Sequence, residues 1–74
     1  MILTSFKTGQ KAKVKRIRGD KNLKERLMRM GIVPGETIEI VRIAPLGSPI
    51  DVLIKRYHLS LRKEEIECIE VEEG

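Results

Sequence analysis

The sequence is short of the residue types on which most recognisable protein chemistry depends. Its 74 residues include one cysteine, one histidine and no tryptophan. A single cysteine cannot form an internal disulfide, which is consistent with a reducing compartment such as the cytosol. With one histidine, a Ser-His-Asp assembly would need Asp20 or Asp51 near a serine, and no spacing supports one. The sequence therefore predicts that the protein is not an enzyme.

Long apolar runs and phosphate-binding glycine motifs are also missing. No stretch approaches the ~18–20 apolar residues that a membrane-spanning helix needs, and residues 1–7 have no sustained apolar run typical of a signal peptide. The patterns G-x-x-x-x-G-K-[ST] and G-x-G-x-x-G are absent, so any nucleotide chemistry belongs to a partner. The sequence predicts a soluble cytoplasmic protein that reaches a membrane only through a partner.

Aromatic side chains are scarce, since Phe6 and Tyr57 are the only two. Small barrels that bind single-stranded nucleic acid stack bases on aromatic side chains in a positive groove. Phe6 lies in an apolar N-terminal segment and is expected in the core, which leaves one stacking residue. A nucleic-acid-binding barrel is therefore only an alternative hypothesis. Recognition of Pro-rich peptides, which needs an aromatic-lined groove, is disfavoured as well.

Charge is plentiful but unevenly distributed along the chain, which has a net charge of +4. Residues 1–35 carry ten Lys or Arg and two Asp or Glu, whereas residues 36–74 carry five and nine. Such asymmetry is typical of a surface that meets an acidic partner or anionic headgroups. Solvated strand faces and an acidic C-terminal segment would explain it equally well.

The hydrophobic pattern predicts a single small, mostly β domain over residues 1–74. Alternating apolar residues predict five strands, within 11–18, 37–44, 50–55, 58–62 and 68–71. A change of parity predicts a bulge or bend in the first strand, and in the second it predicts either a bend or burial on both faces. Leu23, Leu27 and Met30 recur at helical spacing and predict a short helix in the first long connection. This order is typical of a small, partly open SH3-like barrel, with an OB-type barrel as the alternative.

The segment around the end of the helix is the most distinctive in the sequence. Asp20 or Asn22 can cap the start of the helix. Gly31 lies where a helix commonly ends on a left-handed residue. The four residues 33–36, Val-Pro-Gly-Glu, predict a type II turn with glycine at its third position.

These features resemble the FeoA (ferrous iron transport protein A) family over essentially the whole chain. The matching segments are Leu3 to Gly9, Arg26-Leu27, Met30-Gly31-Ile32, Pro34-Gly35, Ala44 to Ile50, Leu59-Ser60-Leu61-Arg62 and Glu65 to Val71. The resemblance implies an SH3-like fold and a supporting role in ferrous iron uptake. The implied partner is a membrane permease (FeoB) that carries a GTP-binding domain, and the role could be assembly, gating or control of GTP hydrolysis. A similar domain ends metal-dependent repressors of the diphtheria toxin repressor type, but these 74 residues include no helix-turn-helix segment and we expect a free-standing domain.

Transition-metal binding is a further expectation, because descriptions of the family often mention it. The weak candidate ligands are His58 and Cys68, which are ten residues apart and could meet with Glu67 or Glu70. No C-x-x-C or H-x-x-x-H spacing supports a closed site. We therefore expect no required cofactor and at most a weak site for Fe²⁺, Zn²⁺ or Mn²⁺. A transition-metal-binding regulatory domain remains an alternative function.

The main hypothesis is a docking surface for the permease. Leu46 lies between two prolines in a hairpin loop, where a large apolar side chain has little structural use, and methionine suits adaptable contacts. The expected docking residues are Arg26, Met28, Arg29, Leu46, Gly47 and Pro49. The competing interpretation is that Leu46 folds back onto the barrel. Under the docking hypothesis, the protein is a non-enzymatic accessory protein that its partner holds at the inner face of the membrane. Exposed strand edges would also allow weak self-association.

Overall fold

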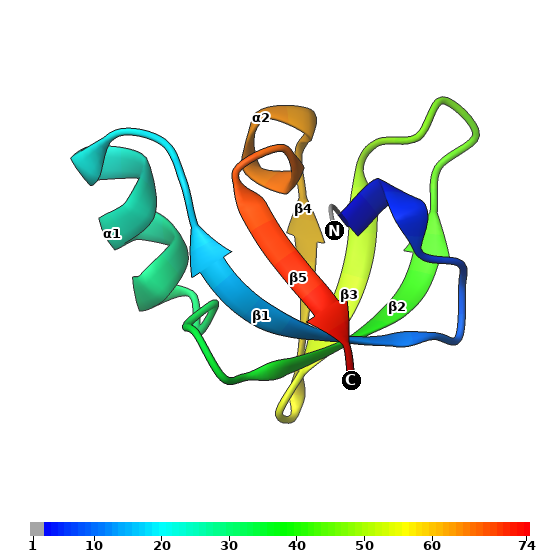
Figure 1. The fold of residues 1–74 in the computed structure, drawn as a ribbon. Coiled ribbons are helices and arrows are strands. Elements are labelled where there is room, and N and C mark those ends of the chain that lie inside the picture. The colour runs from blue at the N-terminus through cyan, green and yellow to red at the C-terminus, as the bar shows by residue number, and fades with distance from the viewer. Residues whose placement is uncertain (1–2) are drawn as a thin grey trace.

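A computed structural model describes residues 3–74 and contains one curled antiparallel sheet (Figure 1). The elements in chain order are the 3-10 helix η1 (Leu3–Ser5), β1 (Lys11–Ile17), α1 (Lys21–Arg29), β2 (Thr37–Ile43), β3 (Ile50–Ile54), β4 (Tyr57–Leu61), α2 (Lys63–Ile66) and β5 (Ile69–Glu73). The strand order in the sheet is β4-β3-β2-β1-β5. The mostly β fold with its helix in the first long connection is therefore confirmed. The first two residues of the expected domain lie outside the described residues.

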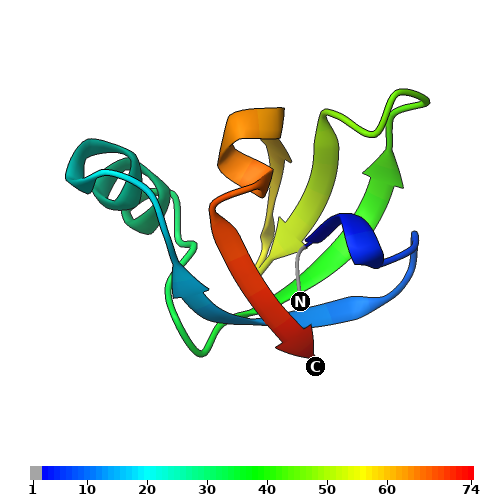
Figure 2. The same cartoon turned by 45° about the horizontal axis from the view of Figure 1, so that its top comes forward.

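Two bulges curl the sheet, at the positions that the parity changes predict. The register of β1 against β5 shifts between Val14 and Arg16, and that of β2 against β3 shifts between Ile40 and Arg42. An extra residue on one strand reverses which side chains face inward and increases the local twist. As a result Ile17 is buried although it differs in parity from Val14. In Figures 1 and 2, α2 connects the end of β4 to the beginning of β5 at one end of the barrel.

The core lies inside the curled sheet and is built from aliphatic side chains. The buried hydrophobic residues are Leu3, Phe6, Ala12, Val14, Ile17, Leu27, Ile32, Ile38, Ile40, Ile50, Val52, Ile54, Leu61, Ile66, Ile69 and Val71. The burial of Phe6 confirms its expected place in the core, and only Tyr57 remains as an exposed aromatic side chain. None of the helices between residues 3 and 74 has the length and apolar character needed to cross a lipid bilayer.

Both ends of α1 are fixed by local hydrogen bonds that the sequence predicts. The carboxylate of Asp20 accepts a hydrogen bond from the backbone N–H of Leu23 at 2.8 Å and caps the helix. After the helix, Gly31 has φ of +97°, and the backbone N–H of Ile32 donates to the carbonyl of Leu27 at 3.0 Å. This is a Schellman termination, in which glycine adopts the left-handed conformation without steric cost.

The predicted type II turn then directs the chain into β2. Gly35 has φ of +96°, and the backbone N–H of Glu36 donates to the carbonyl of Val33 at 3.1 Å. Two further backbone hydrogen bonds of 2.8 Å join Gly35 and Glu36 to Val14 in β1. The turn therefore ties the connection that carries α1 directly to the barrel.

Candidate functional site

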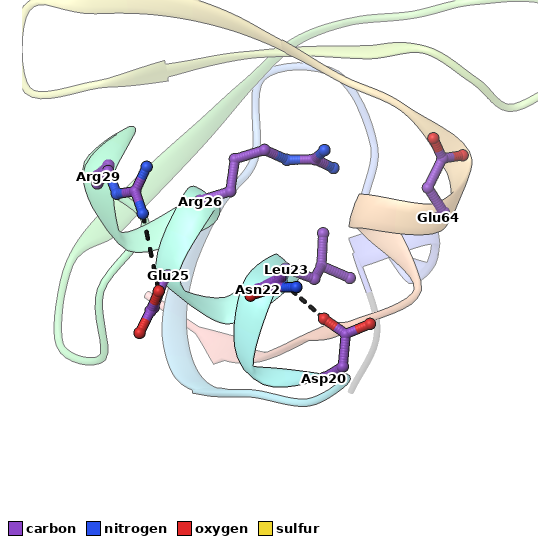
Figure 3. A pocket seen from close by; sticks show the side chains of 7 residues that line it. All are labelled: Asp20, Asn22, Leu23, Glu25, Arg26, Arg29 and Glu64. Atoms are coloured by element: carbon purple, nitrogen blue, oxygen red, sulfur yellow. Dashed lines mark hydrogen bonds and ion pairs between the residues drawn. The ribbon is translucent and has the colours of Figure 1, made fainter.

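An open hollow of about 600 Å³ lies between α1 and α2 (Figure 3). It is lined by Asp20, Asn22, Leu23, Glu25, Arg26, Arg29 and Glu64. The lining is charged except for Leu23 and Asn22, and it contains no serine, cysteine or histidine. Its charged groups are three carboxylates, those of Asp20, Glu25 and Glu64, and the two guanidinium groups of Arg26 and Arg29.

Arg26 is held in this hollow by a buried carboxylate. Its Nη2 lies 3.3 Å from Oε2 of Glu65, whose side chain is only 8% exposed. The other oxygen of Glu65, Oε1, accepts a hydrogen bond from the backbone N–H of Arg62 at 2.8 Å. Figure 3 shows the Arg26 side chain extending from α1 across the hollow toward α2. Glu65 thus links the two helices and fixes the direction of Arg26.

The other two docking candidates on α1 are exposed to solvent. Arg29 makes an ion pair of 3.7 Å with Glu25 on the same helix, and its side chain is 77% exposed. Such i,i+4 surface pairs contribute only about 0.3–0.5 kcal/mol. Met28 is 47% exposed. Both side chains are therefore available for contact with a partner.

A second hollow, of about 480 Å³, lies between the β2–β3 loop and α2. Its lining residues are Ser48, Pro49, Ser60, Arg62, Lys63 and Glu64, so Glu64 borders both hollows. Leu46, at the tip of this loop, is 95% exposed. The interpretation in which Leu46 folds back onto the barrel is wrong, because its side chain contacts almost nothing.

The structure distributes the expected docking residues over the two sides of α2. Arg26, Met28 and Arg29 lie on α1, whereas Leu46, Gly47 and Pro49 lie in the β2–β3 loop. Figure 1 shows α1 and this loop on opposite sides of α2. Of these six residues, Arg26 and Arg29 line the first hollow and Pro49 lines the second.

α2 lies between the two hollows, and Glu64 lines both of them. None of the residues of α2 is among the docking candidates that the sequence predicts. From the sequence, the segment from Lys63 to Ile66 is expected only as a helical turn. A carboxylate three residues after Arg62 is the one signal available, because it resembles a capping box. That signal predicts a local hydrogen bond and says nothing about the distance to α1.

The two weak metal candidates lie in different parts of the barrel. His58 is exposed near the beginning of β4, whereas Cys68 is half-buried just before β5, against Gly19. Figure 1 places the beginnings of β4 and β5 at opposite ends of the barrel. Among the described residues, no group of three His, Cys, Asp or Glu side chains has the arrangement to hold a metal ion.

The strongest electrostatic feature lies away from the two hollows, at Glu70 on β5. Its Oε2 is 3.0 Å from Nε of Arg16 and 2.9 Å from Nη2 of Arg18. Burial raises the pKa of this carboxyl group, but the hydrogen bond from Arg18 and the charges of Arg16, Arg18 and Lys15 outweigh burial. The pKa of Glu70 therefore lies below its ordinary value.

This shift predicts a dependence of stability on acid pH. Because the pKa of Glu70 is lower in the folded than in the unfolded protein, its ionised carboxylate stabilises the fold at pH values above the unfolded pKa of about 4.3. This stabilisation is lost as the pH falls through the folded pKa. We expect Glu70→Gln to lower the urea midpoint most at neutral pH and progressively less in acid. The matched control is Glu73→Gln, at an exposed position of the same strand. An effect of Glu70→Gln that does not change with pH would contradict the assignment.

Comparison with known proteins agrees with this architecture. The FeoA domain model matches residues 1–73. A relative from Porphyromonas gingivalis, named Fe(2+) transport protein A/Fe(2+) transporter FeoB fusion protein, is 40% identical over 72 residues, covering 97% of this chain. The solution structure of iron(II) transport protein A from Clostridium thermocellum is 46% identical, with a TM-score of 0.91 over 99% of this chain. The chain spans only 8% of the first relative and 45% of the second.

A third relative identifies the type of barrel. FeoA from Stenotrophomonas maltophilia was solved in complex with zinc and is described as a prokaryotic SH3 domain protein. It is 25% identical, with a TM-score of 0.81 over 97% of this chain and 89% of its own. The predicted SH3-like architecture is confirmed. From the match of the family model over residues 1–73 and the identities to these relatives, the chain belongs to the FeoA family.

Proposed function

We propose that the protein is a non-enzymatic accessory protein of ferrous iron uptake that binds an FeoB-type permease at the cytoplasmic side of the membrane. The observation that carries this proposal is the fusion protein of Porphyromonas gingivalis, in which a segment 40% identical to this chain shares one polypeptide with an FeoB transporter. Covalent linkage raises the effective concentration of two modules for one another. Such a fusion is useful where the two modules act in contact.

The contact surface that we propose consists of the exposed face of α1 and the β2–β3 loop. Leu46 is the strongest candidate anchor, because a side chain that is 95% exposed contributes almost nothing to the core. Met28 can adapt its flexible side chain to an irregular partner surface. Arg29 adds a positive charge that its weak pair with Glu25 leaves largely available.

Capture of the permease from solubilised membranes of the source cell tests this proposal. We expect the tagged protein to recover the permease, and a Leu46→Glu, Arg29→Glu variant to recover at least about tenfold less, since it replaces an apolar anchor by a charge. The control is Val41→Glu, at an exposed apolar position of β2 that lies outside α1 and the β2–β3 loop. Equal recovery by the folded variant would exclude this surface, and recovery of ribosomes or nucleic acid alone would favour the nucleic-acid alternative.

A second candidate function is metal sensing, which the zinc complex of the Stenotrophomonas maltophilia protein favours. We propose instead that this protein needs no cofactor and holds Fe²⁺, Zn²⁺ or Mn²⁺ weakly. The support is the separation of His58 from Cys68, which leaves each without the other ligands of a closed site. Isothermal titration of tag-free protein with each ion tests this. Tight one-to-one binding that His58→Ala or Cys68→Ala abolishes would favour a metal-responsive regulator.

A further inference from the structure

The hollow beside the β2–β3 loop has the chemistry of a site for an acidic group. Two side chains of its lining, Arg62 and Lys63, are cationic, and Ser48 and Ser60 supply hydroxyl donors. Guanidinium and ammonium groups form strong charge-assisted hydrogen bonds with carboxylates. Hydroxyl groups can donate further hydrogen bonds to the same carboxylate oxygens. None of these four residues belongs to the docking set expected from the sequence.

The charges of this hollow are not neutralised within the described part of the chain. Ion pairs among the described residues involve Arg16, Arg18, Arg26, Arg29 and Lys55, and the other Lys and Arg side chains have none there. Arg62 and Lys63 form no such pair with any residue that the structure describes. The backbone N–H of Arg62 binds Glu65, and this bond leaves the guanidinium group available.

The two hollows on either side of α2 differ in sign. Glu64 lines both of them, but the loop side adds two cations to it, which gives a net positive lining. The α1 side has three carboxylates and two arginines, and each of these arginines is paired with a carboxylate. An anionic group is therefore attracted to the loop side of α2 and not to the α1 side.

We infer that the hollow lined by Arg62, Lys63, Ser48 and Ser60 binds an Asp or Glu side chain of the partner protein, next to the contact made by Leu46. This inference rests on the proposed function, because the partner is the FeoB-type permease. The site is an open hollow of about 480 Å³ between a loop and a helix, which has room for a projecting carboxylate side chain. Ser48 and Pro49 belong to the same loop as Leu46, the proposed anchor of the protein contact, and this favours a side chain of the partner over a lipid headgroup.

The test is the affinity of the protein for the purified permease in detergent, measured by biolayer interferometry at low and high salt. The Arg62→Glu, Lys63→Glu variant is expected to bind at least about tenfold more weakly, with slower association and a weaker dependence on salt. The neutral Arg62→Gln, Lys63→Gln variant should lose less and serves if the reversed variant fails to fold. A matched control, Lys7→Glu, Arg56→Glu, changes the net charge equally at exposed positions away from the hollow and should bind within about twofold of wild type.

The outcomes separate the inference from the function on which it rests. Wild-type affinity in the folded Arg62 and Lys63 variants would overturn the acidic-residue site and leave the proposed function standing. Equal losses in the control would also overturn the site, because net charge alone would then explain binding. No binding of the wild type to the permease would overturn both. Binding to phosphatidylglycerol-containing vesicles that the charge-reversed variant loses would assign the hollow to lipid headgroups and overturn the inference.

Discussion

Leu27→Ala is expected to lower the free energy of unfolding by about 2–5 kcal/mol, the range for removing a fully buried leucine side chain. Leu27 is the buried residue of α1 and has no exposed surface. Its side chain joins the helix to the core, so the substitution leaves a cavity where α1 meets the barrel. Urea unfolding followed by circular dichroism measures the loss directly.

This loss is large for so small a domain. A chain of 74 residues has a total stability of roughly 4–11 kcal/mol at the usual values per residue. The alanine variant would therefore be partly unfolded at the lower end of that range. The control is Met28→Ala, at the adjacent exposed position of α1, which should change the stability by less than about 0.5 kcal/mol. A loss well below 1 kcal/mol for Leu27→Ala would mean that α1 is held mainly by its hydrogen-bonded ends.

The parts of the fold that could be predicted from sequence are those that short-range physics determines. The cap at Asp20 and the glycine termination at Gly31 depend on residues within one helical turn. The two bulges follow from the parity of apolar residues in β1 and β2, because both sides of a parity change must reach one core. The sequence left the exposure of Leu46 open, because a loop residue between two prolines can either project into solvent or fold back onto the barrel, and the structure shows it 95% exposed.

The arrangement of the candidate contact residues depends on contacts between distant parts of the chain, so it is harder to predict from the sequence. The helical pattern places Arg26 at the border of the exposed face of α1, and it does not predict the pair with Glu65, a residue 39 positions away. An acidic residue within a run of charges is usually solvated, and nothing in the local pattern marks Glu65 as buried. The placement of α2 between α1 and the β2–β3 loop likewise depends on how far the sheet curls. The sequence therefore supplies candidate contact residues on α1 and in the β2–β3 loop, but it does not show that α2 lies between them.

Glu65→Ala is expected to lower the free energy of unfolding by about 1.5–3 kcal/mol, because a part-buried hydrogen bond loses its charged acceptor. Without the carboxylate, the backbone N–H of Arg62 has lost the 2.8 Å bond that begins α2. Arg26 loses its partner as well, but its side chain is 56% exposed and can be hydrated. Most of the cost therefore comes from the bond to Arg62. Urea unfolding beside the wild type measures it.

Two further substitutions separate the contributions of Glu65. Glu65→Gln retains an oxygen acceptor for the N–H of Arg62 but removes the charge that attracts Arg26, so we expect a loss of about 1 kcal/mol. Arg26→Ala should cost a similar amount, and a double-mutant cycle between the two positions should give a coupling of about 0.5–1 kcal/mol. If Glu65→Gln instead destabilises as much as Glu65→Ala, the ion pair with Arg26 provides most of the stabilisation. The main role of Arg26 would then be to hold α1 against α2. Its replacement would weaken the proposed binding to the permease by displacing α1, and not by removing a direct contact.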